Sequence, residues 1–176
     1  MDGQSIINKK IARTNLFQKS MVAATTKDTL KLFVEGVTLF SCGLVAGGTC
    51  YITLVELPGR KDLSLEYQLK NYHQLFPRAA GIMKPFGMVL TGLIGGTIYL
   101  TKNSMWWIPM TMFGALGPFT AIAIQPTNDK LMGTPEKDAS QVGDEVANWG
   151  KLHNIRTYMS LVGFAGAVAA VLGVGV

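Results

Sequence analysis

Two groups of polar side chains recur at helical spacing in parts of the chain that are far apart in sequence. The first group is Thr49, Thr53 and Glu56, and the second is Trp149, His153, Arg156 and Ser160. Because residues three or four positions apart share one face of a helix, each group predicts a polar stripe. A third segment adds Gln125 and Asn128, which are three positions apart. If the stripes meet, they form a polar cup at one end of a helical bundle.

These residue types suit acid–base chemistry on an organic substrate. Glu56 or His153 can accept a proton, and Arg156 can stabilise an anion as it forms. Gln125 and Asn128 can orient a carbonyl or hydroxyl group by hydrogen bonding. A structural interpretation competes with this one, since Glu56 and Arg156 can also pair with each other and only hold the bundle together.

Stretches of sequence without charged residues predict the helices that position these side chains. Hydrophobic residues make up 48% of the 176 residues and charged residues 15%, a composition that excludes a soluble enzyme and a disordered chain. No Asp, Glu, Lys or Arg occurs in residues 36–55, 85–101, 103–128 or 157–176. Since a helix needs about 20 apolar residues to cross the hydrocarbon layer, we expect an all-α integral membrane protein with four membrane-spanning helices.

Breaker residues set the expected boundaries of the first two helices. The first helix should run from about Leu30 to the Leu57-Pro58-Gly59 turn, because proline and glycine favour an exit there. The second helix should begin between Arg78 and Pro85. The chain therefore divides into a basic N-terminal tail, residues 1–29, and a four-helix transmembrane domain, residues 30–176.

The third helix is separated from the second by only residues 102–104, so the two should be antiparallel neighbours. We expect Pro109 and Pro118 to bend it and Pro126 to end it near Gln125. After a possible N-cap at Asp62, a short amphipathic helix should lie on the membrane interface. Its apolar positions are Leu65, Leu69, Tyr72 and Phe76. An antiparallel bundle places all the polar stripes on one side of the membrane.

Glycines within the spans indicate close helix packing. The pairs Gly43/Gly47 and Gly92/Gly96 are four residues apart, and Gly166 continues the pattern of small residues. Small residues let helix backbones approach each other in a membrane. We expect these contacts within the monomer.

The basic residues indicate where the protein lies and what it contacts. The formal net charge is +5, but the positive residues flank apolar spans, which favours anionic lipid headgroups and not nucleic acid as the partner. The tail carries Lys9, Lys10, Arg13, Lys19 and Lys27. It suits a headgroup-binding tail, and it is also compatible with a mitochondrial leader. We expect an intracellular membrane, either the mitochondrial inner membrane or the endoplasmic reticulum.

No metal or cofactor signature is present in the sequence. The motifs Cys-x-x-Cys and His-Glu-x-x-His are absent, and two cysteines are too few to form a disulfide scaffold in a chain of this size. His73 and His153 are the only histidines, so a haem held by both is formally possible, but nothing else in the sequence favours it. We expect no metal and no cofactor.

Three short motifs, in this order, resemble the anthrone oxygenase-like family of small four-helix membrane proteins. The run from Tyr51 to Arg60 closes the first span, Pro126-Thr-Asn128 closes the third, and the run from Trp149 to Arg156 opens the fourth. The likeness covers about Leu30 to Val176. It implies that anthrones are converted to anthraquinones with molecular oxygen and without an evident cofactor.

The resemblance also implies roles for individual residues. His153 or Glu56 would be the base, Arg156 would stabilise the anion, Asn128 would orient it, and Trp149 would stack on a flat aromatic substrate entering from lipid. Two alternatives stay open at this point. One is a non-catalytic accessory subunit of a larger organelle membrane complex, such as a mitochondrial respiratory assembly. The other is a protein that binds an apolar aromatic, quinone-like or lipid ligand without turnover.

Overall fold

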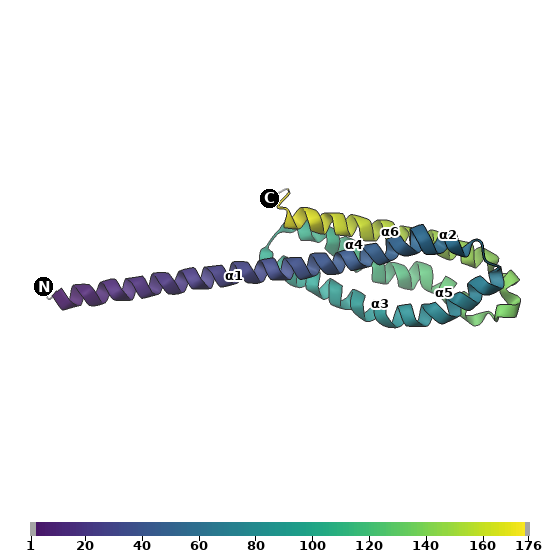
Figure 1. Ribbon diagram of the computed structural model, residues 1–176, viewed down its shortest axis with the longest axis horizontal. Coiled ribbons are helices and arrows are strands. Elements are labelled where there is room, and N and C mark those ends of the chain that lie inside the picture. Colours follow the sequence, from purple (N-terminus) through teal and green to yellow (C-terminus); the bar gives the residue numbers. More distant parts are fainter. Residues whose placement is uncertain (1–2, 175–176) are drawn as a thin grey trace.

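A computed structural model describes the backbone of residues 3–174 and the side chains of Arg13 and residues 16–174. Every regular element in this part of the chain is helical, and the helices form four long antiparallel paths (Figure 1). The first path is α1 (Gly3–Tyr51), the π-helix η1 (Ile52–Glu56) and α2 (Leu57–Arg60), and the second is α3 (Leu65–Thr101). The third path is η2 (Ser104–Trp106), α4 (Trp107–Phe119), the π-helix η3 (Thr120–Ile124) and α5 (Gln125–Gly133). The fourth is η4 (Glu136–Val142) and α6 (Gly143–Val171).

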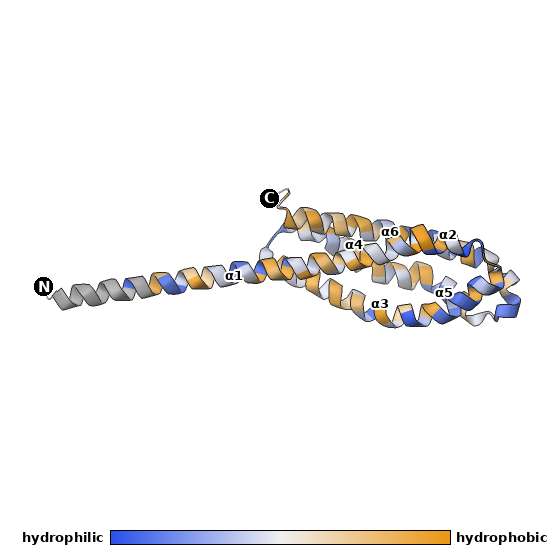
Figure 2. Cartoon of the chain, in the orientation of Figure 1, coloured by the Kyte–Doolittle hydropathy of each residue, from blue (hydrophilic) through white to orange (hydrophobic). Residues whose placement is uncertain are grey.

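The predicted all-α, four-helix membrane bundle is confirmed. Among the described residues, three stretches are long and apolar enough to cross a membrane, namely Leu16–Arg60, Leu65–Thr101 and Ser104–Gly133; the predicted fourth span, in α6, is not one of them. The fourth helix, α6, completes the bundle and packs against α1 and α4. Figure 2 shows apolar residues along the middle of the bundle and hydrophilic residues gathered at the end that carries the two long connections.

The buried side chains form two separate clusters. The larger cluster, in the middle of the bundle, contains Cys42, Leu90, Ile94, Trp106, Phe113, Ala167 and Ala170. The smaller cluster lies at the end with the long connections and contains Leu69, Tyr72, Leu131, Ala139 and Val142. Trp149, a residue of the predicted polar cup, packs on this smaller cluster. Apolar contacts therefore help to hold the residues of the cup in place.

The first helix begins much earlier than expected. The predicted start near Leu30 is wrong, since α1 runs without interruption from Gly3 to Tyr51. Residues 4–35 contain neither proline nor glycine, so nothing in their local chemistry ends a helix. The segment expected as a tail is therefore helical in the described residues, and its path is continuous with the first span.

The amphipathic segment is helical as predicted, but it is not a separate short helix on the interface. It forms the first part of α3, which continues through Pro77 and Pro85. The helix is capped by Ser64 and not by Asp62: the Ser64 hydroxyl accepts a hydrogen bond from the Tyr67 backbone N–H at 3.4 Å. This first part packs against α5 and η4, and that packing helps to offset the backbone hydrogen bond lost at Pro77.

The prediction that Pro126 ends the third helix is also wrong, because the helical path continues through α5 to Gly133. A π-helix precedes both Pro58 and Pro126. A proline ring collides with the carbonyl four residues earlier in a regular α-helix. Those carbonyls belong to Leu54 and Ile122, which lie within the two π-helices. The wider π turn accommodates each proline, so the chain does not have to leave the helix.

The glycines divide into two classes. A Cβ built on Gly166 would lie 2.5 Å from Ile108 Cγ2, and one on Gly43 would lie 3.2 Å from Phe164, so these two glycines are packed against a neighbouring helix. No atom lies within 4 Å of such a Cβ on Gly47, Gly92 or Gly96. The expectation of packing within the monomer is correct for the first class and wrong for the second.

Candidate functional site

The centre of the polar cup is a buried amide that joins three helices. Asn128, on α5, is 2% exposed. Its Oδ1 accepts a hydrogen bond from the Tyr72 hydroxyl of α3 at 2.6 Å and another from the Trp149 Nε1 of α6 at 3.1 Å. One side chain thus fixes the positions of two aromatic rings from different helices.

These two rings belong to an aromatic stack that reaches a histidine. Trp149 is stacked on His153 with ring centroids 5.1 Å apart and planes 14° from parallel. Tyr72 meets Trp149 edge to face at 5.8 Å. On the other side, Tyr72 stacks on Phe76 at 5.2 Å. Asn128, Trp149 and His153, three of the predicted site residues, therefore form one continuous group.

His153 is buried and held in one orientation. Only 2% of its surface is exposed, and its Nε2 lies 3.3 Å from the backbone carbonyl of Thr49 on α1. A carbonyl only accepts hydrogen bonds, so in the neutral imidazole Nε2 carries the hydrogen and Nδ1 keeps its lone pair. Within the described residues, the buried Nδ1 has no hydrogen-bond partner. The Nδ1 lone pair is therefore not engaged by the fold, but it is closed off from solvent.

The predicted charged residues are not paired as the structural interpretation assumed. Glu56 forms an ion pair with Arg60, one turn further along the first path, and not with Arg156. The guanidinium of Arg60 also lies 5.8 Å from the ring of Trp149, in a cation–π position. Arg156 is half-buried, and its guanidinium makes no hydrogen bond or ion pair to another described residue. Glu56 thus reaches the aromatic group only through Arg60.

Gln125 does not belong to the cup. Its amide donates a hydrogen bond to Asp129 Oδ1 at 2.6 Å on the exposed side of α5. The i, i+3 spacing of Gln125 and Asn128 therefore does not bring their side chains to the same place. A predicted substrate-binding role for Gln125 has no support in its position.

A cavity of about 490 Å³ lies beside the aromatic group, between the end of the first path, the start of α3 and the start of α6. Its wall includes Tyr72 and Trp149 and three basic residues, Arg60, Lys61 and Lys151. None of the described residues that line it is acidic. Trp149 alone among the six predicted site residues lines this cavity, and His153 lies behind Trp149.

Sequence reasoning missed Tyr72, Arg60, Lys61 and Lys151. In the sequence, Tyr72 was identified only as one member of an apolar stripe. Its hydroxyl nevertheless needs a hydrogen-bond partner when the residue is buried. Arg60 was visible as the last residue of a motif. Nothing local indicates that Lys151 and Lys61, which are far apart in sequence, line the same cavity.

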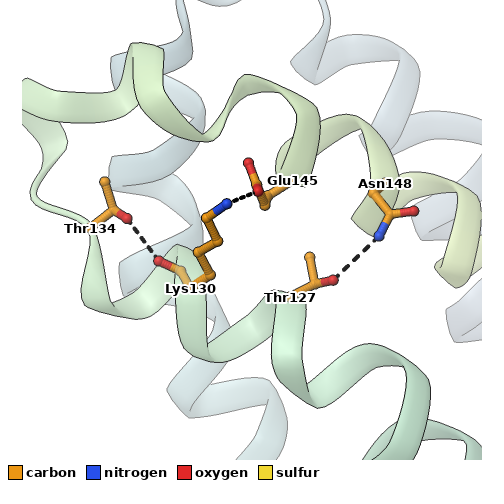
Figure 3. Close-up of polar contacts among 5 residues, drawn as sticks. All are labelled: Thr127, Lys130, Thr134, Glu145 and Asn148. Carbon is orange, nitrogen blue, oxygen red and sulfur yellow. Dashed lines mark hydrogen bonds and ion pairs between the residues drawn. The ribbon is translucent and has the colours of Figure 1, made fainter.

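Polar contacts fix α5 against α6 on the outer side of the cup (Figure 3). Lys130 forms an ion pair with Glu145, and the Asn148 amide donates a hydrogen bond to the Thr127 hydroxyl at 3.4 Å. The hydrogen bond from Lys130 lowers the pKa of Glu145 below its usual value. These contacts flank Asn128 in the chain and so help to hold its amide in reach of Trp149.

The second histidine belongs to a different neighbourhood. His73 Nε2 lies 2.9 Å from the backbone carbonyl of Leu131, and Nδ1 lies 4.0 Å from Glu136. In the described part of the chain, no group of three or more His, Cys, Asp or Glu side chains is placed to hold a metal ion.

Comparison with known proteins identifies the family. The family model described as anthrone oxygenase matches residues 72–166, which is more than half of the 176 residues. This range is narrower than the resemblance seen in the sequence, since it contains the motifs at Pro126–Asn128 and Trp149–Arg156 but not the one at Tyr51–Arg60. No curated protein and no solved structure is significantly similar to the chain. The match over Tyr72 to Gly166 shows that the chain belongs to the anthrone oxygenase family.

Proposed function

We propose that the protein is a membrane oxygenase that oxidises a flat phenolic compound of the anthrone type with molecular oxygen and without a cofactor. Family membership supports the reaction class. The observation that carries the proposal is the aromatic and basic cavity next to a buried histidine with a free Nδ1. Such a site can accept a proton and stabilise the resulting anion.

The proposed reaction replaces two hydrogen atoms of a methylene group by one oxygen atom. A base removes one proton from the methylene carbon, and the resulting anion spreads its charge over the ring system and the carbonyl oxygen. This electron-rich carbon reacts with oxygen and keeps one oxygen atom as a new carbonyl. The second oxygen atom leaves as water with both hydrogens, so oxygen is the only oxidant consumed.

Three side chains have distinct proposed roles. Trp149 offers its ring as a stacking surface for the substrate, since it lines the cavity. Arg60 also lines the cavity and stabilises the anion, in the role expected of Arg156. His153 accepts the proton on Nδ1. Because Trp149 separates His153 from the cavity, proton transfer requires the Trp149 ring to shift off His153 while it keeps its stacking contact with the substrate.

The test is oxidation of an anthrone by the purified protein in mild detergent. We expect His153→Ala to lower the rate by about 100-fold or more, which is the usual contribution of a general base. Oxygen uptake and the absorbance of the quinone product measure the rate, and empty micelles correct for spontaneous oxidation. His73→Gln is the matched control, because His73 contacts a different part of the fold. A folded His153→Ala protein with full activity would rule out the proposed base.

One observation favours a second function, that of an accessory subunit. The N-terminal part of α1 projects well beyond the other helices (Figure 1). The rest of the chain leaves large apolar side chains on it uncovered, with Leu16 70%, Phe17 66% and Val22 66% exposed. An exposed apolar helix is typical of a surface that binds another protein. Under this alternative, deletion of residues 1–26 releases the protein from a larger complex, and His153→Ala has no effect on that association.

The cellular setting belongs to the same proposal. The apolar helices show a membrane protein. We place it in an intracellular membrane, the mitochondrial inner membrane or the endoplasmic reticulum, with anionic lipid headgroups near the basic residues of α1. Localisation of the tagged full chain by microscopy tests this placement.

A further inference from the structure

The cavity carries more positive charge than its own fold neutralises. Arg60, Lys61 and Lys151 line it, and no acidic residue in the described part of the chain does. Arg60 is paired with Glu56. Neither Lys61 nor Lys151 forms an ion pair with a described residue. The two lysines therefore leave two uncompensated charges at the cavity.

The location of the cavity gives these charges access to water. Of the lining residues, only Thr53 lies within the charge-free windows of residues 36–55, 85–101, 103–128 and 157–176. The cavity is thus at the hydrophilic end of the bundle that Figure 2 shows. Lys61 and Lys151 are both exposed, so they form a rim, while the aromatic wall lies deeper.

The deeper part of the cavity suits a ring system. Tyr72 and Trp149 contribute aromatic surface, and Leu57 and Leu131 contribute apolar surface. The volume of about 490 Å³ is within the range of ~300–1,000 Å³ that is usual for small-molecule sites. A molecule that satisfies both parts has a flat aromatic body and an acidic group at one end.

We infer that the cavity binds flat aromatic acids, with the rings against Trp149 and a carboxylate at Lys61 and Lys151. The inference rests on the proposed function, and it specifies the substrate of the oxygenase as an aromatic compound that carries an acidic group besides the reacting carbonyl. Asp62 and Asp144 lie near the rim in sequence, but they do not line the cavity and neither forms an ion pair with Lys61 or Lys151, so both ammonium groups are free to contact a carboxylate.

The test compares two fluorescent probes with the same ring system, the anion anthracene-2-carboxylate and the neutral 2-(hydroxymethyl)anthracene. Binding to the purified full chain in zwitterionic detergent is followed by energy transfer from tryptophan. An exposed ion pair strengthens binding by a factor of about 1.4 to 5. Two such pairs should therefore make the carboxylate bind about 2- to 30-fold more tightly at low salt, and added salt should reduce this preference.

The rim variant Lys61→Gln/Lys151→Gln should bring the two affinities within about twofold of each other, with binding of the neutral probe unchanged. Lys70→Gln/Lys137→Gln is the matched control, since it removes the same charge from residues that do not line the cavity. Equal affinity of the two probes in the natural protein, or a preference that survives in the rim variant, would overturn the inference. Displacement of the carboxylate probe by phosphatidylglycerol would also overturn it, because a lipid phosphate would then be the occupant.

Turnover of an uncharged anthrone separates this inference from the proposed function. If turnover is present but the probes show no charge preference, only the aromatic-acid inference fails. If the charge preference is present but no anthrone, charged or neutral, is oxidised, the oxygenase proposal fails and the binding site stands.

Discussion

Replacing Asn128 with leucine tests whether this amide holds the aromatic group together. The change removes the acceptor of two hydrogen bonds, at 2.6 Å from Tyr72 and 3.1 Å from Trp149. A buried donor without a partner costs about 1–3 kcal/mol. Tyr72 is 5% exposed, so its unpaired hydroxyl should cost an amount near the middle of that range. The unpaired indole N–H of the half-buried Trp149 should cost about 1 kcal/mol. We expect Asn128→Leu to lower the free energy of unfolding by about 2–4 kcal/mol.

A second substitution tests whether the loss of stability comes from the unpaired donors. Tyr72→Phe removes one of the two donors, so by itself it should cost only about 1 kcal/mol. Added to Asn128→Leu, the same change removes an orphaned donor and should restore about 1–2 kcal/mol. The two changes are therefore expected to be strongly non-additive.

The assay is chemical unfolding in mild detergent, followed by tryptophan fluorescence and helical circular dichroism. Gln125→Leu is the control, because its hydrogen bond to Asp129 is on the exposed side of α5, and we expect a change within about 0.5 kcal/mol. If the double variant is less stable than Asn128→Leu alone, the loss does not come from orphaned donors, and the argument for Asn128 as an organising residue is refuted.

Two other predictions concern the fold. Gly166→Ala should be less stable than Gly92→Ala by about 1–3 kcal/mol in unfolding measurements, because only the new Cβ at 166 collides with a neighbouring helix, at 2.5 Å from Ile108; equal stabilities would contradict the close packing of α4 and α6. Single cysteines at Arg13 and Lys137 should be labelled from opposite sides of a sealed vesicle by an impermeant reagent, and labelling of both from one side would contradict the antiparallel topology.

Much of the fold could be predicted because it depends on patterns within short segments. A long window without charge predicts a membrane span wherever it occurs, because burying an unpaired charge in hydrocarbon is costly. The connection at residues 102–104 is too short for any arrangement but an antiparallel pair. The helix boundaries were less predictable. The helix α3 continues through Pro77 and Pro85, with its first part packed on α5 and η4, and π turns precede Pro58 and Pro126.

The candidate site could be predicted in part for the same reason. Helical spacing showed that Trp149 and His153 share a face, and antiparallel connectivity brought them near Asn128. Spacing does not show how far each helix is rotated or which of several partners a long side chain reaches. Glu56 contacts Arg60 in place of Arg156, and Gln125 turns toward Asp129, because each finds a nearer partner on its own helical path.

The sequence by itself determined that the chain is a helical membrane protein with polar stripes at the ends of its helices, since hydrophobicity, charge and helical period are properties of short segments. Only the tertiary structure decided that Tyr72 and Trp149 share the Asn128 oxygen, that His153 keeps a free Nδ1, and that Lys61 and Lys151 line one cavity. These features join residues from different helices. They depend on the rotation and depth of each helix, which are fixed by the packing of all four together.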